Sequence, residues 1–64
     1  METKRFWLIE LRKKENISQE ELAKKCNTTQ MTISNIENGT RRPSPELAKE
    51  IAKVLNFEWT EFYE

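Results

Sequence analysis

Side chains that commonly catalyse reactions or bind metals are scarce in this 64-residue chain. It has no histidine and a single cysteine, Cys26, so it can build neither a zinc site nor an internal disulfide. It has no glycine-rich loop to hold a phosphate, and a domain this small has little room for a substrate pocket. The sequence therefore argues against an enzyme and predicts no metal and no cofactor. We interpret Cys26 as a small buried hydrophobic residue, with a redox or metal sensor as the less favoured alternative.

Charge and hydrogen bonding are the chemistry that remains. The formal net charge is zero, but its distribution is uneven. Residues 1–45 hold nine Lys/Arg and six Glu, a net of +3, whereas residues 46–64 hold two Lys and five Glu, a net of −3. We expect a mildly basic body and an acidic, aromatic C-terminal end. On charge alone, nucleic-acid binding and an ordinary solvated surface are equally compatible with the sequence.

No segment predicts export or membrane insertion. The apolar run 6–9 is far too short for a signal peptide, and no run approaches the length of a membrane span. We therefore expect a soluble cytoplasmic protein with no membrane association, and we interpret the three N-x-S/T triplets as helix-boundary residues.

Capping residues divide the chain into short helices. Leu8 and Leu11 lie on one face of a first helix, and Ser18 with Glu21 forms a capping box that starts a second. The expected segments are 4–14, 19–26, 30–37, 45–55 and a final apolar turn or short helix with Phe57, Trp59, Phe62 and Tyr63. We expect one all-α domain over residues 1–64.

Segments 19–26 and 30–37 are joined by about three residues, which is the spacing of a helix-turn-helix motif. The motif runs over 18–39. Its short turn would hold the helices at a wide angle, so that the second enters a DNA major groove while the first lies across the backbone. Ala23 would allow close packing of the two helices, and Ile33 and Ile36 would anchor the second to the core.

Several short motifs occur together along the chain. They are Leu11-Arg12, Ser18-Gln19-Glu20-Glu21-Leu22-Ala23, Thr32-Ile33-Ser34 and, above all, Ile36-Glu37-Asn38-Gly39 followed by Arg42-Pro43-Ser44. In combination they resemble the lambda-type phage repressor and Cro domains and the wider group of xenobiotic-response-element (XRE) regulators. The resemblance covers about residues 8–62. It implies a compact five-helix domain that binds double-stranded operator DNA, usually as a homodimer, and a monomer in solution is compatible with it.

The resemblance also implies roles for individual residues. Base reading is implied for Gln30, Met31, Ser34 and Asn35, where a glutamine or asparagine amide can pair with adenine. Phosphate contact, which positions the protein without specifying sequence, is implied for Gln19, Thr29, Thr32, Asn38, Thr40, Arg41 and Arg42. A side-chain hydrogen bond between Gln19 and Gln30 and a structural salt bridge between Arg12 and Glu37 are implied as well.

Three residues depart from the family pattern. Asn27 stands where glycine is usual in the turn, at some conformational cost. Met31 replaces a polar or charged residue, so that its contact would be with a thymine methyl group. Cys26 replaces an aliphatic core residue.

Two questions stay open at this point. The C-terminal aromatic residues either close the core or form a dimer interface. We expect Trp59 and Phe62 to lie mainly in the core. Tyr63 and its neighbours, Phe57 and Trp59 among them, are the candidates for an interface. The alternative to a DNA-binding regulator is a protein-interaction module of the same fold, antitoxin-like or anti-repressor-like, whose acidic aromatic end would meet a protein partner.

Overall fold

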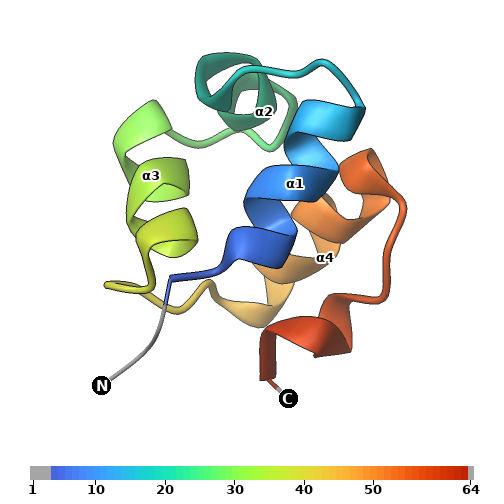
Figure 1. Ribbon diagram of the computed structural model, residues 1–64. Helices are drawn as coiled ribbons and strands as arrows, with labels where there is room; N and C mark the ends of the chain where they lie inside the picture. The colour runs from blue at the N-terminus through green and yellow to red at the C-terminus, as the bar shows by residue number, and fades with distance from the viewer. Residues whose placement is uncertain (1–3, 64) are drawn as a thin grey trace.

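The computed structural model describes residues 4–63, so residues 1–3 and 64 of the predicted 1–64 domain lie outside the described residues. The elements are α1 (Phe6–Lys14), α2 (Gln19–Lys25), α3 (Gln30–Asn38), α4 (Pro45–Leu55) and a 3₁₀ helix, η1 (Trp59–Tyr63). Figure 1 shows α3 on one side of α1 and the C-terminal segment on the other. The predicted all-α class is confirmed, because residues 4–63 contain helices and no strand.

The final apolar segment was expected as a turn or a short helix, and within residues 4–63 it follows four α-helices as a short 3₁₀ helix. Residues Trp59–Tyr63 form a 3₁₀ helix of five residues, a conformation that proteins use in short pieces because its hydrogen-bond geometry is poorer than that of an α-helix and its side chains at i and i+3 eclipse. The first helix also begins later than expected, at Phe6 and not at residue 4. Arg5 precedes it and turns its side chain into the protein.

Three of the helices begin at side-chain caps, the predicted Ser18 among them. Ser18, Thr29 and Ser44 have extended backbone, and each side-chain oxygen accepts a hydrogen bond from the backbone N–H three residues later, at 3.0–3.2 Å. Each cap satisfies a donor that the first helical turn leaves without a partner. The starts of α2, α3 and α4 are therefore set by local chemistry.

Left-handed residues follow each of the four α-helices. Asn16, Asn27 and Asn56 have φ of 58°, 56° and 62°, and Gly39 has φ of 80°. Asparagine tolerates this region better than other residues with a side chain, and glycine does so without steric cost. The chain can therefore turn sharply after each helix, which keeps the connection from α2 to α3 short.

The core is an apolar cluster to which all four α-helices and η1 contribute. Its buried members are Leu8, Leu22, Ala23, Cys26, Ile33, Ile36, Ala48, Ile51, Leu55 and Phe62. Beside it, the rings of Trp7, Phe57 and Phe62 pack against one another with centroids 5.2–5.6 Å apart, a spacing typical of favourable aromatic pairs. No helix within residues 4–63 is long and apolar enough to cross a membrane.

Candidate nucleic-acid interface

Helix α3 has one face in the core and the opposite face in solvent. Ile33 and Ile36 are completely buried, whereas Gln30 is exposed and Met31 has 73% of its surface exposed. At 100° per residue, Met31, Ser34 and Asn35 lie on the outward side of the helix. Ser34 and Asn35 are half-buried, so the N-terminal turn is the most accessible part of this face.

The turn between α2 and α3 fixes the position of that face. The backbone N–H of Thr28 donates to the carbonyl oxygen of Ala23 at 2.9 Å, and the N–H of Asn27 donates to that of Lys24 at 3.2 Å. Ala23 is buried, and its small side chain allows α3 to pack closely. The described residues thus form the helix-turn-helix arrangement that the spacing predicted.

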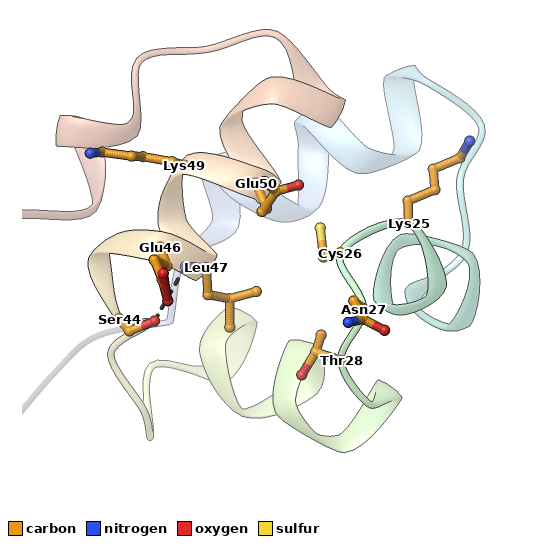
Figure 2. A pocket seen from close by; sticks show the side chains of 9 residues that line it. All are labelled: Lys25, Cys26, Asn27, Thr28, Ser44, Glu46, Leu47, Lys49 and Glu50. Carbon is orange, nitrogen blue, oxygen red and sulfur yellow. Dashed lines mark hydrogen bonds between the residues drawn. The ribbon is translucent and has the colours of Figure 1, made fainter.

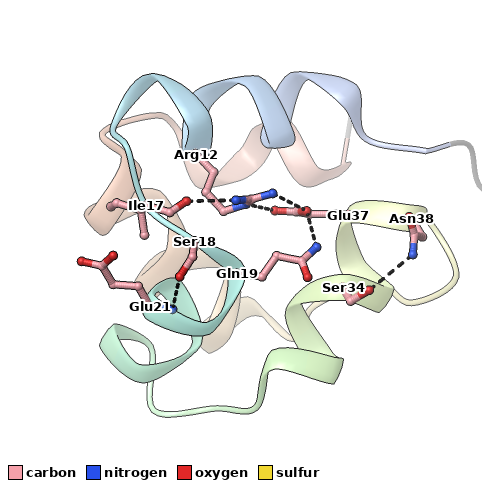
Figure 3. A network of polar contacts seen from close by, with 8 residues as sticks. All are labelled: Arg12, Ile17, Ser18, Gln19, Glu21, Ser34, Glu37 and Asn38. Atoms are coloured by element: carbon pink, nitrogen blue, oxygen red, sulfur yellow. Dashed lines mark hydrogen bonds and ion pairs between the residues drawn. The ribbon is translucent and has the colours of Figure 1, made fainter.

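A buried charged network connects α3 to α1 and α2 (Figure 3). Arg12 Nε donates to Glu37 Oε2 at 2.6 Å and Arg12 Nη2 donates to Glu37 Oε1 at 3.2 Å. Arg12 Nη1 donates to the carbonyl oxygen of Ile17 at 2.9 Å. The Arg12 and Glu37 side chains are only 12% and 1% exposed. The ion pair that the resemblance implied is therefore present, and it ties the C-terminal half of α3 to the first helix.

The Gln19 side chain belongs to this network instead of pairing with Gln30. Its Nε2 donates to Glu37 Oε1 at 2.8 Å. A buried carboxylate needs several donors, and a hydrogen bond to a charged group is stronger than one between two neutral amides. The expected hydrogen bond between Gln19 and Gln30 was therefore wrong for residues 4–63 of this chain: Glu37 orients Gln19, and the Gln30 amide stays exposed at the start of α3.

The remaining polar residues predicted to contact DNA lie at the two ends of α3. The hydroxyl groups of Thr29 and Thr32 are hydrogen-bonded to each other at 2.9 Å near its N-terminus. At the C-terminus, Asn38 Nδ2 donates to Ser34 Oγ at 3.4 Å, and the Thr40 hydroxyl donates to the carbonyl oxygen of Asn35 at 3.1 Å. Arg41 and Arg42 follow in an exposed loop. The structure thus places the predicted phosphate contacts on both sides of the predicted base readers.

Arg5 is a residue whose role the sequence did not indicate. Its side chain is buried, with 7% exposure, and its Nη1 donates to the carbonyl oxygens of Ile36 at 2.7 Å and Arg41 at 3.2 Å. Its backbone N–H donates to the carbonyl oxygen of Glu37 at 2.8 Å. A cation there stabilises the negative end of the helix dipole of α3. From the sequence, a single arginine near a chain end is expected to be a solvated charge, so only the tertiary structure reveals this contact.

The C-terminal aromatic residues are used mainly inside the protein. Phe62 is buried, and Phe57 and Trp59 are half-buried against the core. Tyr63 is 41% exposed, but its hydroxyl donates to the carbonyl oxygen of Pro43 at 2.9 Å. The Lys49 ammonium lies 4.9 Å from the centroid of the Trp59 ring. Among these four aromatic residues, Phe57, Trp59 and Tyr63 are therefore only partly exposed to solvent.

An open groove between the end of α2 and the start of α4 contains Cys26 (Figure 2). Its volume is about 630 Å³, and its walls carry both lysine and glutamate side chains. None of the residues predicted to contact DNA lines it. Cys26 itself is buried, as the sequence predicted. Burial, and to a lesser degree the Glu50 carboxylate, raises the pKa of its thiol to about 11.

We expect Cys26 to react very slowly with thiol reagents in the folded protein. With a pKa of about 11, roughly one thiol in 10⁴ is ionised at pH 7, and the thiolate is the reactive form. Labelling with a chromogenic disulfide should therefore accelerate about tenfold per pH unit between pH 7 and 9. The same protein in guanidinium chloride is the control and should react as an ordinary cysteine. Rapid labelling of the folded protein at pH 7 would show that the thiol is accessible and activated.

Comparison with known proteins agrees with this geometry. The helix-turn-helix family model matches residues 8–62. The chain is 42% identical to the HTH-type transcriptional regulator YqaF of Bacillus subtilis over 60 residues, which cover 94% of this chain and 79% of the relative. It is 47% identical over 47 residues to an HTH-type transcriptional regulator of Archaeoglobus fulgidus, covering 73% of this chain and 66% of the relative. No solved structure matches the chain significantly. The chain therefore belongs to the helix-turn-helix family of Cro/C1-type XRE transcriptional regulators.

Proposed function

We propose that this protein is a sequence-specific transcriptional regulator that binds operator DNA by placing α3 in the major groove. The observation that carries the proposal is the outward face of α3. There Met31 is 73% exposed beside an exposed Gln30, on a helix whose opposite face is completely buried. An exposed methionine adds little to folding, whereas an apolar side chain in the major groove can contact a thymine methyl group.

The proposed base contacts follow from the chemistry of the outward side chains. The Gln30 amide can donate to adenine N7 and accept from adenine N6 at the same time. Asn35 can read adenine in the same way, and Ser34 can donate or accept. Both lie one turn further along α3 and are half-buried. Gln30 and Met31 therefore contribute most of the proposed sequence preference.

The proposed phosphate contacts lie around these readers and set affinity. They are Gln19, Thr29, Thr32, Asn38, Thr40, Arg41 and Arg42. Gln19 uses one of its two amide N–H groups for Glu37, so the second is the one proposed to reach a phosphate. We propose that all 64 residues act as one DNA-binding unit, in the cytoplasm, without cofactor or catalytic activity.

We also propose that two copies bind together on DNA. The chain has no net charge, so a single copy should have little non-specific affinity. Two copies would read half-sites about 34 Å apart. The exposed edges of Phe57, Trp59 and Tyr63 are the proposed contact between copies. Native mass spectrometry of the complex tests this, because the proposal requires two chains per duplex.

Replacing Arg41 by alanine tests DNA binding by the loop after α3. We expect weaker binding to all duplexes alike, with the slope of log K against log salt reduced by about 0.9, since one phosphate contact is lost. Fluorescence anisotropy of labelled duplexes between 50 and 200 mM salt, a range over which this dependence is large, measures the slope. Lys53→Ala is the matched control, because it removes the same charge from the exposed side of α4. Equal slopes for the two variants would remove Arg41 from the proposed interface.

A further inference from the structure

Two residues from opposite ends of the chain hold the backbone of the loop that carries Arg41 and Arg42. From the N-terminal side, Arg5 Nη1 donates to the carbonyl oxygen of Arg41 at 3.2 Å. From the C-terminal side, the Tyr63 hydroxyl donates to the carbonyl oxygen of Pro43 at 2.9 Å. The two acceptors lie on either side of Arg42 in the sequence. Residues 41–43 have no helical structure of their own, so these contacts are well placed to order them.

The N-terminal contact also links the loop to α3. The same Arg5 Nη1 donates to the carbonyl oxygen of Ile36 at 2.7 Å, and the guanidinium carbon lies 5.8 Å from the centroid of the Phe62 ring. A buried guanidinium with several carbonyl partners and an aromatic neighbour is held firmly. The position of the loop relative to α3 therefore depends on Arg5.

The C-terminal contact extends to the Arg42 side chain. The Arg42 guanidinium carbon lies 5.9 Å from the centroid of the Tyr63 ring, within the range of a cation–π contact. The Tyr63 ring is itself held by Trp59, because the two rings are in edge contact with centroids 5.7 Å apart. Tyr63 thus restrains both the loop backbone and the direction of one guanidinium.

We propose that Arg5 and Tyr63 are positioning residues for the phosphate contacts of Arg41 and Arg42. They order the loop before DNA arrives, so that less conformational entropy is lost on binding. This inference rests on the proposed function. Phosphate contacts position the protein but carry no sequence information, so the two residues set affinity for every duplex and leave the preferred sequence unchanged.

The Tyr63→Phe variant tests this positioning role, because it removes the hydroxyl and keeps the ring. In the free protein, we expect the ¹⁵N order parameters of the Arg41 and Arg42 amides to fall from about 0.85 toward 0.6, with the helices unchanged. On DNA, we expect about 3–10-fold weaker binding to selected and random duplexes alike, as for one lost hydrogen bond. Thr60→Ala, which removes an exposed hydroxyl from the same helix, should change neither.

A double-mutant cycle separates positioning from general structural support. The effect of Tyr63→Phe on affinity should vanish when Arg41 and Arg42 are both alanine, and should persist in the Gln30→Ala background. Arg5→Lys keeps the charge but loses the planar fork that reaches two carbonyl groups, and it should loosen the same loop amides.

Three results would overturn the inference, and each is recognisable. Unchanged loop order and affinity in Tyr63→Phe would show that the hydroxyl contact orders nothing. An undiminished effect in the background without Arg41 and Arg42 would show that Tyr63 acts elsewhere. A wild-type protein that binds no duplex at any salt concentration would instead overturn the proposed function, and the positioning role with it.

Discussion

Replacing Arg12 by methionine is expected to lower the free energy of unfolding by about 3–5 kcal/mol, because it leaves a buried charge without its partner. Glu37 is 1% exposed, and Arg12 supplies two of its hydrogen bonds, at 2.6 and 3.2 Å. Methionine keeps much of the length of arginine but donates nothing. The carbonyl oxygen of Ile17 loses a donor at the same time. A domain of this size has about 3–10 kcal/mol of stability in total. The expected loss is therefore a large fraction of the free energy of unfolding.

Urea unfolding followed by circular dichroism measures this effect. Lys13→Met is the matched control, since Lys13 is the exposed neighbour of Arg12 on α1, and it should change stability by no more than about 0.5 kcal/mol. Combining Arg12→Met with Glu37→Leu should recover part of the loss, because an apolar pair no longer leaves a charge buried. If Arg12→Met were as stable as Lys13→Met, the network would not hold α3 in place.

Replacing Gln30 by alanine is expected to weaken binding to the preferred duplex by about 1–3 kcal/mol, or roughly 5–150-fold. Gln30 is exposed at the first position of α3, so the change removes little buried surface and should leave the unfolding free energy nearly unchanged. The loss arises because a base edge in the groove loses a two-point hydrogen-bonding partner. The variant should also accept other bases at one position of the site.

Anisotropy titrations of one preferred and one scrambled duplex distinguish base reading from simple attraction. Gln30→Ala should lose affinity for the preferred duplex only. Asn38→Ala, at the other end of the same helix, is the contrasting variant, because a lost phosphate contact should weaken both duplexes equally. If Gln30→Ala bound the preferred duplex as tightly as the wild type, the base-reading role of Gln30 would be wrong.

The helix boundaries could be predicted because they depend on neighbouring residues. Ser18, Thr29 and Ser44 cap helices through hydrogen bonds that span three residues, and Asn27 and Gly39 supply the left-handed conformations after α2 and α3. Such contacts join residues that are close in the sequence, so the residue types in a short stretch are enough to predict them. The outward and inward faces of α3 follow from the same local periodicity.

Contacts between distant segments could not be predicted in the same way. The partner of Gln19 depended on how closely α2 approaches the end of α3, where the buried Glu37 carboxylate competes with Gln30 for its amide. The burial of Arg5 depends on the end of α3, which lies 31 residues away in the sequence. Tyr63, which the sequence suggested for an interface, reaches Pro43 across the domain. In each case the chemistry of the residue allowed several partners, and only packing selected one.

Selection of binding sites from random duplex DNA tests the central claim most directly. The wild-type protein and Gln30→Ala would be carried through the same rounds at low salt, and the enriched pools sequenced. We predict that the wild type enriches one motif, repeated as two half-sites about one helical turn apart, and that Gln30→Ala enriches the same motif with one relaxed position. Recovery of no motif by the wild type would contradict sequence-specific DNA binding and favour a protein partner for this fold.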